Sequence, residues 1–244
     1  MNKVIATMLG TALVAGLGSC SDDDSNAATS GRAVSQTVTI NDFLSSEPVD
    51  GVNLCWSLNG GEDTCVSTNA DGKATGSVDY VAGDLLVLNA TKDNFFPFRV
   101  EYYLDEDTPE TAEVTWAIIG DALVDIVVAA LGAEADPAKG HITVLITDGT
   151  QAIEGATAEM TTGTAAQGPN YSNSDTSTGI FSDQGITTDA GIVAFNNVDP
   201  GEVVLTVNVD GKTCTAVAGE NAGENKVGSL IEAGKLTYTS VLCE

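Results

Sequence analysis

The stretches TVLITDGTQAIEGATA, residues 143–158, and GITTDAGIVAFNNVDPGEVVLTV, residues 185–207, have looser counterparts earlier in the chain. The counterparts are TVTIND at 37–42, EPVDGVNL at 47–54, TNADG at 68–72 and YVAGDLLVL at 80–88. An internal repeat has to be recognised before any fold is assigned, because it determines the whole architecture. Two copies of one module therefore make up most of this chain.

Each copy has the pattern of β-strands. Val38 and Ile40 alternate with polar residues, as Val144 and Ile146 do with Thr and Leu, and a pleated strand with one buried face requires this period of two. Turn sequences such as Asp199-Pro200-Gly201 separate the strands at intervals suited to a sandwich. The sequence therefore predicts an all-β protein with two tandem antiparallel β-sandwiches.

The second copy resembles the carboxypeptidase regulatory-like domain, a transthyretin-like (Ig-like) β-sandwich. The resemblance rests on turn and core positions, which are Ile153, Gly155, Ala156, Thr187, Thr188, Asp189, Gly191, Val193, Phe195, Asn197, Val198, Pro200, Gly201, Val203, Leu205 and Val207. The first copy matches more loosely. The resemblance implies a transthyretin-like fold and no catalytic residues, and such domains occur in accessory modules of peptidases and in bacterial surface proteins.

The predicted organisation has four parts. They are a signal peptide at 1–19, an acidic and polar tether at 20–34, a first sandwich at 35–135 and a second at 136–244. A polar insertion at 163–179 distinguishes the second copy from the first.

A helix is predicted at 111–131, near the junction of the two domains. Its apolar face would carry Trp116, Ile119, Leu123, Ile126, Val127 and Ala130, at helical spacing. Such a helix either packs on a sandwich or docks a partner, and the pattern leaves both readings open.

The N-terminus predicts export and a lipid anchor at Cys20. The uncharged apolar stretch at 4–17 is shorter than the roughly 20 residues that a membrane-spanning helix needs. Leu17-Gly18-Ser19-Cys20 resembles the bacterial lipobox, in which the cysteine receives diacylglycerol and, in many lipoproteins, palmitate. An ordinary secretory signal with a chance cysteine is the alternative. The acidic run at 22–24 resembles the surface-export signal of Bacteroidetes-type lipoproteins or is a soluble spacer, so we expect a lipid-anchored protein of the bacterial outer membrane or cell surface.

The charge excludes one class of partner. Without residues 1–19 the chain has 8 cations against 35 acids, a net charge of −27 with histidine neutral. This charge repels nucleic acid phosphates, so no nucleic-acid binding is expected.

Four cysteines remain once Cys20 is set aside. An even number in an exported chain favours disulfides, and their positions predict Cys55–Cys65 in the first copy and Cys214–Cys243 in the second. A metal site is disfavoured because the chain has one histidine and no CxxC spacing.

Two groups of residues are candidates for ligand binding. Phe95, Phe96 and Phe98 are predicted to offer an exposed stacking platform for a sugar or peptide, unless they fill the core. The loop at 167–175, with Tyr171, Asn173 and Asp175, is the second candidate, because long polar loops on rigid scaffolds often carry specificity. A surface insertion without a role is the alternative reading of this loop.

Catalysis is not predicted. The single histidine, His141, has no HExxH or GxSxG motif around it, and a structural role is expected for it. No cofactor is expected, although Asp71, Asp84, Asp189 and Asp199 lie in turns and leave Ca²⁺ binding as an alternative.

The expected function is a membrane-anchored, non-catalytic binding or scaffold module, with a glycan or an envelope protein as its partner. An accessory subunit of an envelope uptake or adhesion complex is the alternative. A carboxylate-based hydrolase is a remote one.

Replacement of Cys20 by Ser tests the anchor. We expect the precursor to remain unlipidated and the protein to leave the membrane fraction, because no acyl chain is then attached. Fractionation of cells that express the full chain measures this. A Cys20→Ser protein that still partitions into membranes would contradict the lipid anchor.

Overall fold

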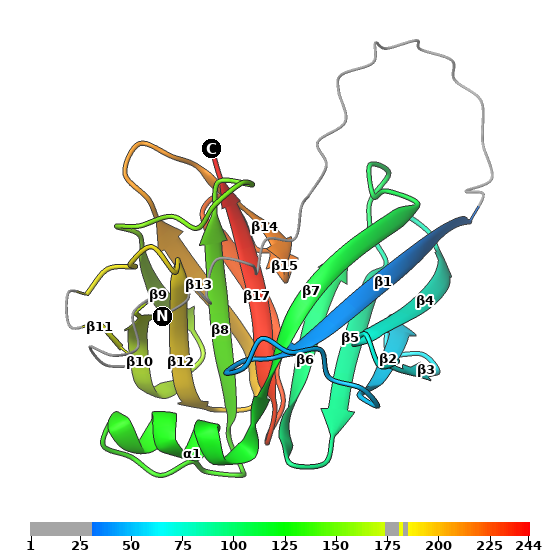
Figure 1. The fold of residues 1–244 in the computed structure, drawn as a ribbon. Helices are drawn as coiled ribbons and strands as arrows, with labels where there is room; N and C mark the ends of the chain where they lie inside the picture. The colour runs from blue at the N-terminus through cyan, green and yellow to red at the C-terminus, as the bar shows by residue number, and fades with distance from the viewer. Residues whose placement is uncertain (1–30, 174–180, 183–184) are drawn as a thin grey trace.

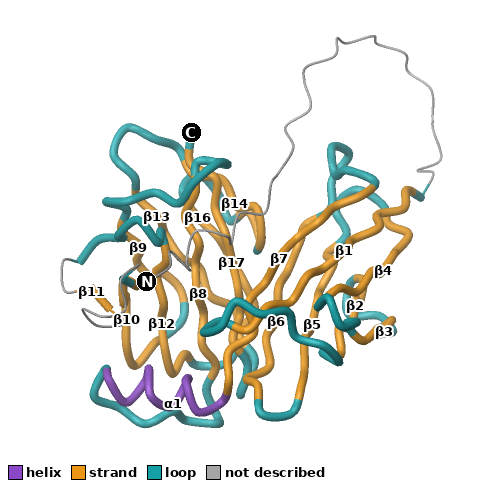
Figure 2. Tube along the Cα trace, viewed as in Figure 1, coloured by secondary structure: helices purple, strands orange, loops and turns teal. Residues whose placement is uncertain are grey.

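The computed structural model describes residues 31–173, 181–182 and 185–244 (Figure 1). Cys20, Asp175 and the predicted signal peptide lie outside these residues. The described chain forms two β-rich halves side by side, with a single helix at the lower edge of the C-terminal half in this view (Figures 1 and 2). This architecture confirms the predicted all-β class with one helix near the junction of the two halves.

The N-terminal half has seven strands followed by the helix. They are β1 (Arg32–Asp42), β2 (Asn53–Leu58), β3 (Thr64–Ser67), β4 (Lys73–Tyr80), β5 (Leu85–Lys92), β6 (Phe95–Tyr103), β7 (Thr111–Gly120) and α1 (Asp121–Ala130).

The C-terminal half contributes ten strands among the described residues. They are β8 (Gly140–Thr147), β9 (Thr157–Thr162), β10 (Ala165–Ser172), β11 (Phe181–Ser182), β12 (Ile192–Val198), β13 (Gly201–Asn208), β14 (Cys214–Ala218), β15 (Glu220–Asn221), β16 (Lys226–Ile231) and β17 (Leu236–Cys243).

The two halves have the same strand pairing. β1 pairs antiparallel with β4 and parallel with β7, and β8 pairs antiparallel with β12 and parallel with β17. On the facing sheet, β5 lies between β2 and β6, and β13 lies between β9 and β16. The repeat in the sequence is therefore a repeat of strand topology.

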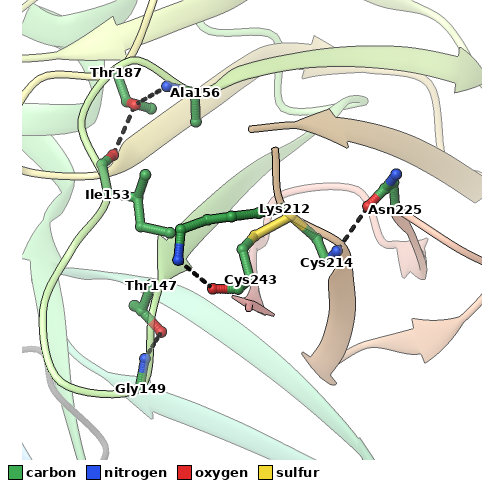
Figure 3. Close-up of a disulfide and its surroundings, with 9 residues drawn as sticks. All are labelled: Thr147, Gly149, Ile153, Ala156, Thr187, Lys212, Cys214, Asn225 and Cys243. Atoms are coloured by element: carbon green, nitrogen blue, oxygen red, sulfur yellow. Dashed lines mark hydrogen bonds between the residues drawn. A yellow bond between two sulfur atoms is a disulfide. The ribbon is translucent and has the colours of Figure 1, made fainter. Parts of the chain in front are cut away.

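A threonine fixes the same turn in both copies. The Oγ1 atom of Thr187 donates a hydrogen bond to Ile153 O and accepts one from Ala156 N, both at 2.8 Å (Figure 3). Thr68 makes the equivalent bonds, to Val49 O at 2.7 Å and from Val52 N at 2.9 Å. These bonds satisfy backbone groups that leave the strand ladder, which explains why the motif recurs in the sequence.

Glycine is required where the repeated turn meets the first strand of each copy. Gly191 has φ +61°, and a Cβ atom there would lie 2.7 Å from Ile146 O. Gly72 has φ +71° and its Cβ would lie 2.5 Å from Ile40 O. Both the left-handed backbone and the close approach exclude a side chain at these positions.

The predicted helix at 111–131 is wrong in its first half. Residues Thr111–Gly120 form β7, which pairs in parallel with β1 over eight residue pairs. Threonine, valine, isoleucine and tryptophan favour a pleated, half-buried strand, and this long-range pairing outweighs the local helical spacing. In α1 itself the buried residues are Val124 and Val128, whereas Ile126 of the predicted apolar face is 58% exposed.

Two predicted irregular segments are also partly strand. β1 begins at Arg32, inside the predicted tether, because residues 32–34 pair with residues 78–80 of β4. The predicted insertion at 163–179 contains β10, which pairs with the edge of β12. Residues 174–179 of that insertion lie outside the described residues. Within the described ranges, no helix is long and apolar enough to cross a membrane.

Both predicted disulfides are present. Cys55 and Cys65 are directly opposite on β2 and β3. Cys214 and Cys243 are directly opposite on β14 and β17, and Figure 3 shows this second bridge. Each bridge therefore joins neighbouring strands within its own half, as the positions of the cysteines predicted.

The last strand, β17, joins the two halves. It pairs in parallel with β8 of its own half and, through residues 236–238, with β6 of the other half. Tyr238 of β17 enters the N-terminal core, where its ring lies 5.3 Å from those of Phe98 and Trp116, and its hydroxyl donates to Ala117 O at 3.0 Å. The first sandwich thus contains a side chain from the second copy.

A buried ionic cluster reinforces this junction. Arg99 of β6 contacts Glu101 and Glu232, each at 2.6 Å, and Glu101 accepts a hydrogen bond from Ser229 Oγ at 2.7 Å. Burial opposes ionisation of Glu232, but hydrogen bonds and charges from Lys235 and Arg99 outweigh it and lower the Glu232 pKa. Since Glu232 and Ser229 belong to the second copy, the cluster links the halves electrostatically.

Replacement of Glu101 by Ala is expected to destabilise the protein by about 3–5 kcal/mol, because it leaves Arg99 buried beside one carboxylate instead of two. Urea unfolding of the full chain measures the loss. Glu113→Ala, at an exposed position of β7, is the matched control and should change stability by less than about 0.5 kcal/mol. Equal effects of the two substitutions would show that the cluster does not hold the junction.

Candidate functional site

An apolar pocket of about 240 Å³ lies where the two halves meet. Its floor is the outer face of β8, β12 and β17, and α1 contributes Leu123, Val124 and Val127. Phe96 of β6 and Trp116 of β7 line it from the N-terminal half. The pocket is therefore built from both copies and from the helix that connects them.

The alternation of side chains along the strands explains this apolar floor. In β8, Ile142, Val144 and Ile146 point into the sandwich core, so Thr143 and Leu145 point outward. In β12 the outward residues include Ile192 and Ala194. Outward residues of a sandwich strand are usually polar. These apolar ones face a pocket that is also lined by Phe43 and Leu44 and by the apolar side chains of α1.

One polar pair lies within this apolar wall. His141 Nδ1 and Asn196 Oδ1 are 3.0 Å apart, and the two residues are 3% and 5% exposed. Because a carbonyl oxygen only accepts, Nδ1 of the neutral imidazole donates this hydrogen bond. The edge of the ring also contacts Phe96, with the centroids 5.4 Å apart.

Burial lowers the pKa of His141, and the hydrogen bond to Asn196 only partly opposes this shift. The imidazole is therefore neutral near pH 7. None of the described residues that line the pocket is an acid, a lysine or an arginine. The described lining can thus hold a neutral apolar molecule, and these residues offer no charged group to an ion.

The predicted aromatic platform is wrong for Phe98, which is 1% exposed and packs in the N-terminal core. Phe95 is partly buried against the same core. Phe96 lines the pocket instead of an open surface. The reason is that β6 lies between β5 and β17 and is buried at this junction.

The predicted binding loop is divided among three environments. Tyr171 is 4% exposed, in the C-terminal core, and its hydroxyl accepts a hydrogen bond from Ala158 N, so an exposed role is wrong for it. Asn173 lines the pocket. Asp175 lies outside the described residues. The structure therefore brings together Phe96 and Asn173 among the predicted residues.

Sequence reasoning missed most of the pocket. His141 was expected to be structural, and Leu145, Ile192 and Asn196 were not singled out. The available signal was that Leu145 and Ile192 are apolar at outward positions of their strands, which indicates that another element covers them.

Two of the aspartates in turns, which left Ca²⁺ binding as an alternative, make contacts that stabilise local structure. Asp84 accepts hydrogen bonds from Val81 N and Asn59 Nδ2, which lower its pKa. Asp199 pairs with Lys139. Within the described part of the chain, no group of three histidine, cysteine or acidic side chains is placed to bind a metal ion.

Comparisons with known proteins yield distant structural likenesses. No family model and no curated protein sequence matches the chain. Similar solved structures include the TIE protein of Bacillus anthracis, at 13% identity and TM-score 0.31, which covers 87% of this chain and 34% of that one. The minor pilin GBS52 of Streptococcus agalactiae matches at 13% identity and TM-score 0.29, over 86% of this chain and 95% of that one.

The 5-hydroxyisourate hydrolase of Klebsiella pneumoniae is similar over a shorter stretch, at 18% identity and TM-score 0.27, covering 36% of this chain and 85% of that one. This chain spans about a third of the length of the TIE protein. Identities and TM-scores this low assign neither a family nor an activity. The chain is thus defined by its own features, an all-β double sandwich with an apolar pocket at the junction.

The stability of the protein should fall as the pH drops below the ordinary histidine pKa of 6.5, because His141 has a lower pKa when folded and the unfolded chain then binds more protons. The loss should stop once the pH passes the lowered pKa. We expect the difference in unfolding free energy between wild type and His141→Asn to shrink over this range, since carboxylate titrations are common to both. A difference that stays constant from pH 8 to pH 5 would contradict a buried, neutral His141.

Proposed function

We propose that this chain is a lipid-anchored binding protein of the bacterial cell surface that has no catalytic role, and that its ligand occupies the pocket that both halves and α1 line. The observation that carries the proposal is the construction of the pocket from both sandwiches and the helix. A pocket with few polar groups in an apolar wall is the usual form of a small-molecule site.

The predicted leader with Cys20 supports the proposed location. Both disulfides support it as well, since such bridges persist in oxidising compartments outside the cytoplasm. The resemblance of the second copy to carboxypeptidase regulatory-like domains agrees with a surface module without catalytic residues.

The wall of the pocket bears on the class of ligand. A glycan needs many hydrogen-bonding groups, whereas the pocket wall is mostly aliphatic and aromatic. An apolar small molecule therefore fits this site better than a sugar does. Glycan binding elsewhere on the surface stays a prediction.

A second candidate is docking to an envelope protein, as in an accessory subunit of a complex. Leu44, which lines the pocket, is 68% exposed, and Ile126 on α1 is 58% exposed. Exposed large apolar side chains of this kind also occur at protein interfaces. We rank this function second because two separate side chains do not make a contiguous patch.

Identification of the compounds that stay bound to the purified protein tests the proposed function. The full chain is incubated with organic extracts of spent growth medium and re-isolated, and bound compounds are identified by mass spectrometry. We expect an apolar compound to be recovered unchanged from the wild type and lost from Ala194→Trp, because an indole at position 194 fills the pocket.

Ala166→Trp is the matched control, since Ala166 is exposed on the neighbouring strand β10. It should retain the compound. Recovery of a chemically altered compound would contradict the absence of catalysis. Equal recovery from the wild type and Ala194→Trp would place binding outside the pocket.

A further inference from the structure

The imidazole of His141 has one nitrogen that the fold leaves for the pocket. Within the described residues the ring makes a single hydrogen bond, from Nδ1 to Asn196 Oδ1 at 3.0 Å. Nε2 has no partner among them, yet it is not one of the fully buried side-chain atoms that lack a partner. Since His141 lines the pocket, the accessible part of Nε2 belongs to the pocket wall.

The orientation of the Asn196 amide can be derived from α1, without reference to His141. Leu131 O, at the C-terminal end of α1, is a backbone carbonyl that only accepts, so Gln167 turns its Nε2 atom to it at 3.1 Å. Gln167 Oε1 then remains a buried acceptor without a donor in the described part of the chain. Gln167 lies opposite Asn196 in the β10–β12 register, and Asn196 Nδ2 is a buried donor without an acceptor there. The two amides are complementary in this orientation, which leaves Asn196 Oδ1 to face His141.

This order of amides determines which nitrogen carries the imidazole proton. Because Asn196 Oδ1 only accepts, Nδ1 carries the proton and donates it. Burial lowers the pKa of His141, so the ring has no second proton near pH 7. Nε2 therefore presents a lone pair to the pocket. A ligand that fills the pocket displaces water from this acceptor, and a donor on the ligand is needed to replace the lost hydrogen bond.

The remaining wall restricts the rest of the ligand. Its described side chains are aliphatic or aromatic apart from a few hydroxyl and amide groups, and none of them carries a charge. A charged ligand would lose its hydration without compensation there. Since an apolar cavity of about 150 Å³ holds benzene, a cavity of about 240 Å³ suits a somewhat larger body, such as two fused rings.

We infer that the pocket binds a neutral, largely apolar small molecule that carries one hydrogen-bond donor, a hydroxyl or a ring N–H, which donates to His141 Nε2. This inference rests on the proposed function and specifies the ligand class for the same site. Asn196 is a positioning residue in this arrangement, because it keeps the imidazole proton on Nδ1.

Three naphthalene probes of similar size test this inference. 2-Naphthol is neutral at pH 7 and can donate, 2-methoxynaphthalene can only accept, and 2-methylnaphthalene can do neither. Binding of each to the full chain at pH 7 is measured by equilibrium dialysis. We expect 2-naphthol to bind about five-fold more tightly than 2-methylnaphthalene, the factor that corresponds to one net hydrogen bond. 2-Methoxynaphthalene should bind no more tightly than 2-methylnaphthalene.

Two variants of β8 locate the donor's partner. His141→Leu should bind 2-naphthol and 2-methylnaphthalene equally, and its affinity for the methyl probe reports that the pocket is still folded. Thr143→Val is the matched control, because it removes a hydroxyl from the same wall at nearly constant volume. It should keep the five-fold preference for 2-naphthol.

A variant at position 196 tests the positioning role. Asn196→Leu removes the acceptor that holds the proton on Nδ1, so the ring can carry it on Nε2 and donate. This variant should therefore bind 2-methoxynaphthalene more tightly than 2-methylnaphthalene, which a loss of packing alone would not produce. An unchanged ratio of these two affinities would show that Asn196 does not control the proton.

The other outcomes overturn distinct statements. If the wild type binds 2-naphthol and 2-methylnaphthalene equally and Ala194→Trp binds neither, the pocket is a binding site but the inferred ligand class is wrong. If Thr143→Val removes the preference and His141→Leu keeps it, His141 Nε2 is not the acceptor. If Ala194→Trp binds the probes as the wild type does, or if no probe binds the wild type, the pocket is not a site for small apolar molecules and the proposed function fails with it.

Discussion

The packing of Tyr238 between Phe98 and Trp116 is the contact on which the rest of the structure depends. Tyr238 belongs to the last strand of the chain, but its ring lies in the core of the first sandwich. Burial there raises the pKa of its hydroxyl, which donates to Ala117 O. A tyrosine in this position needs β17 to pair with β6, so the two sandwiches are held as one body.

The pairing of β17 with β6 also forms the pocket. With β17 fixed against β6, Phe96 and Trp116 of the first half line one pocket with His141 and Leu145 of the second, and α1 adds Leu123, Val124 and Val127 to it. The helix α1 begins directly after β7 ends, so the position of β7 also determines where α1 lies. Neither half alone contains all the walls of the site.

Structural features that depend on nearby residues, or that recur in both copies, could be predicted from the sequence. The turns at Gly72 and Gly191 and the two disulfides follow from short patterns, because a neighbouring strand supplies each partner. Features that depend on distant pairing were not predictable. Thr111–Gly120 has helical spacing but is a strand because β1 pairs with it. Phe98 is a core residue because β6 pairs with β17, whose Tyr238 packs against it. The pocket was missed because its walls come from both halves, which are brought together by the pairing of β17 with β6.

Differential scanning calorimetry of two core variants tests most directly whether the halves form one cooperative body. Leu54→Ala lies in the N-terminal core and Leu205→Ala in the C-terminal core, and each should cost about 2–5 kcal/mol. The account predicts one unfolding transition in the wild type, which either substitution shifts as a whole to lower temperature. Two separable transitions, of which each variant moves only its own, would show that β17 and Tyr238 do not unite the sandwiches.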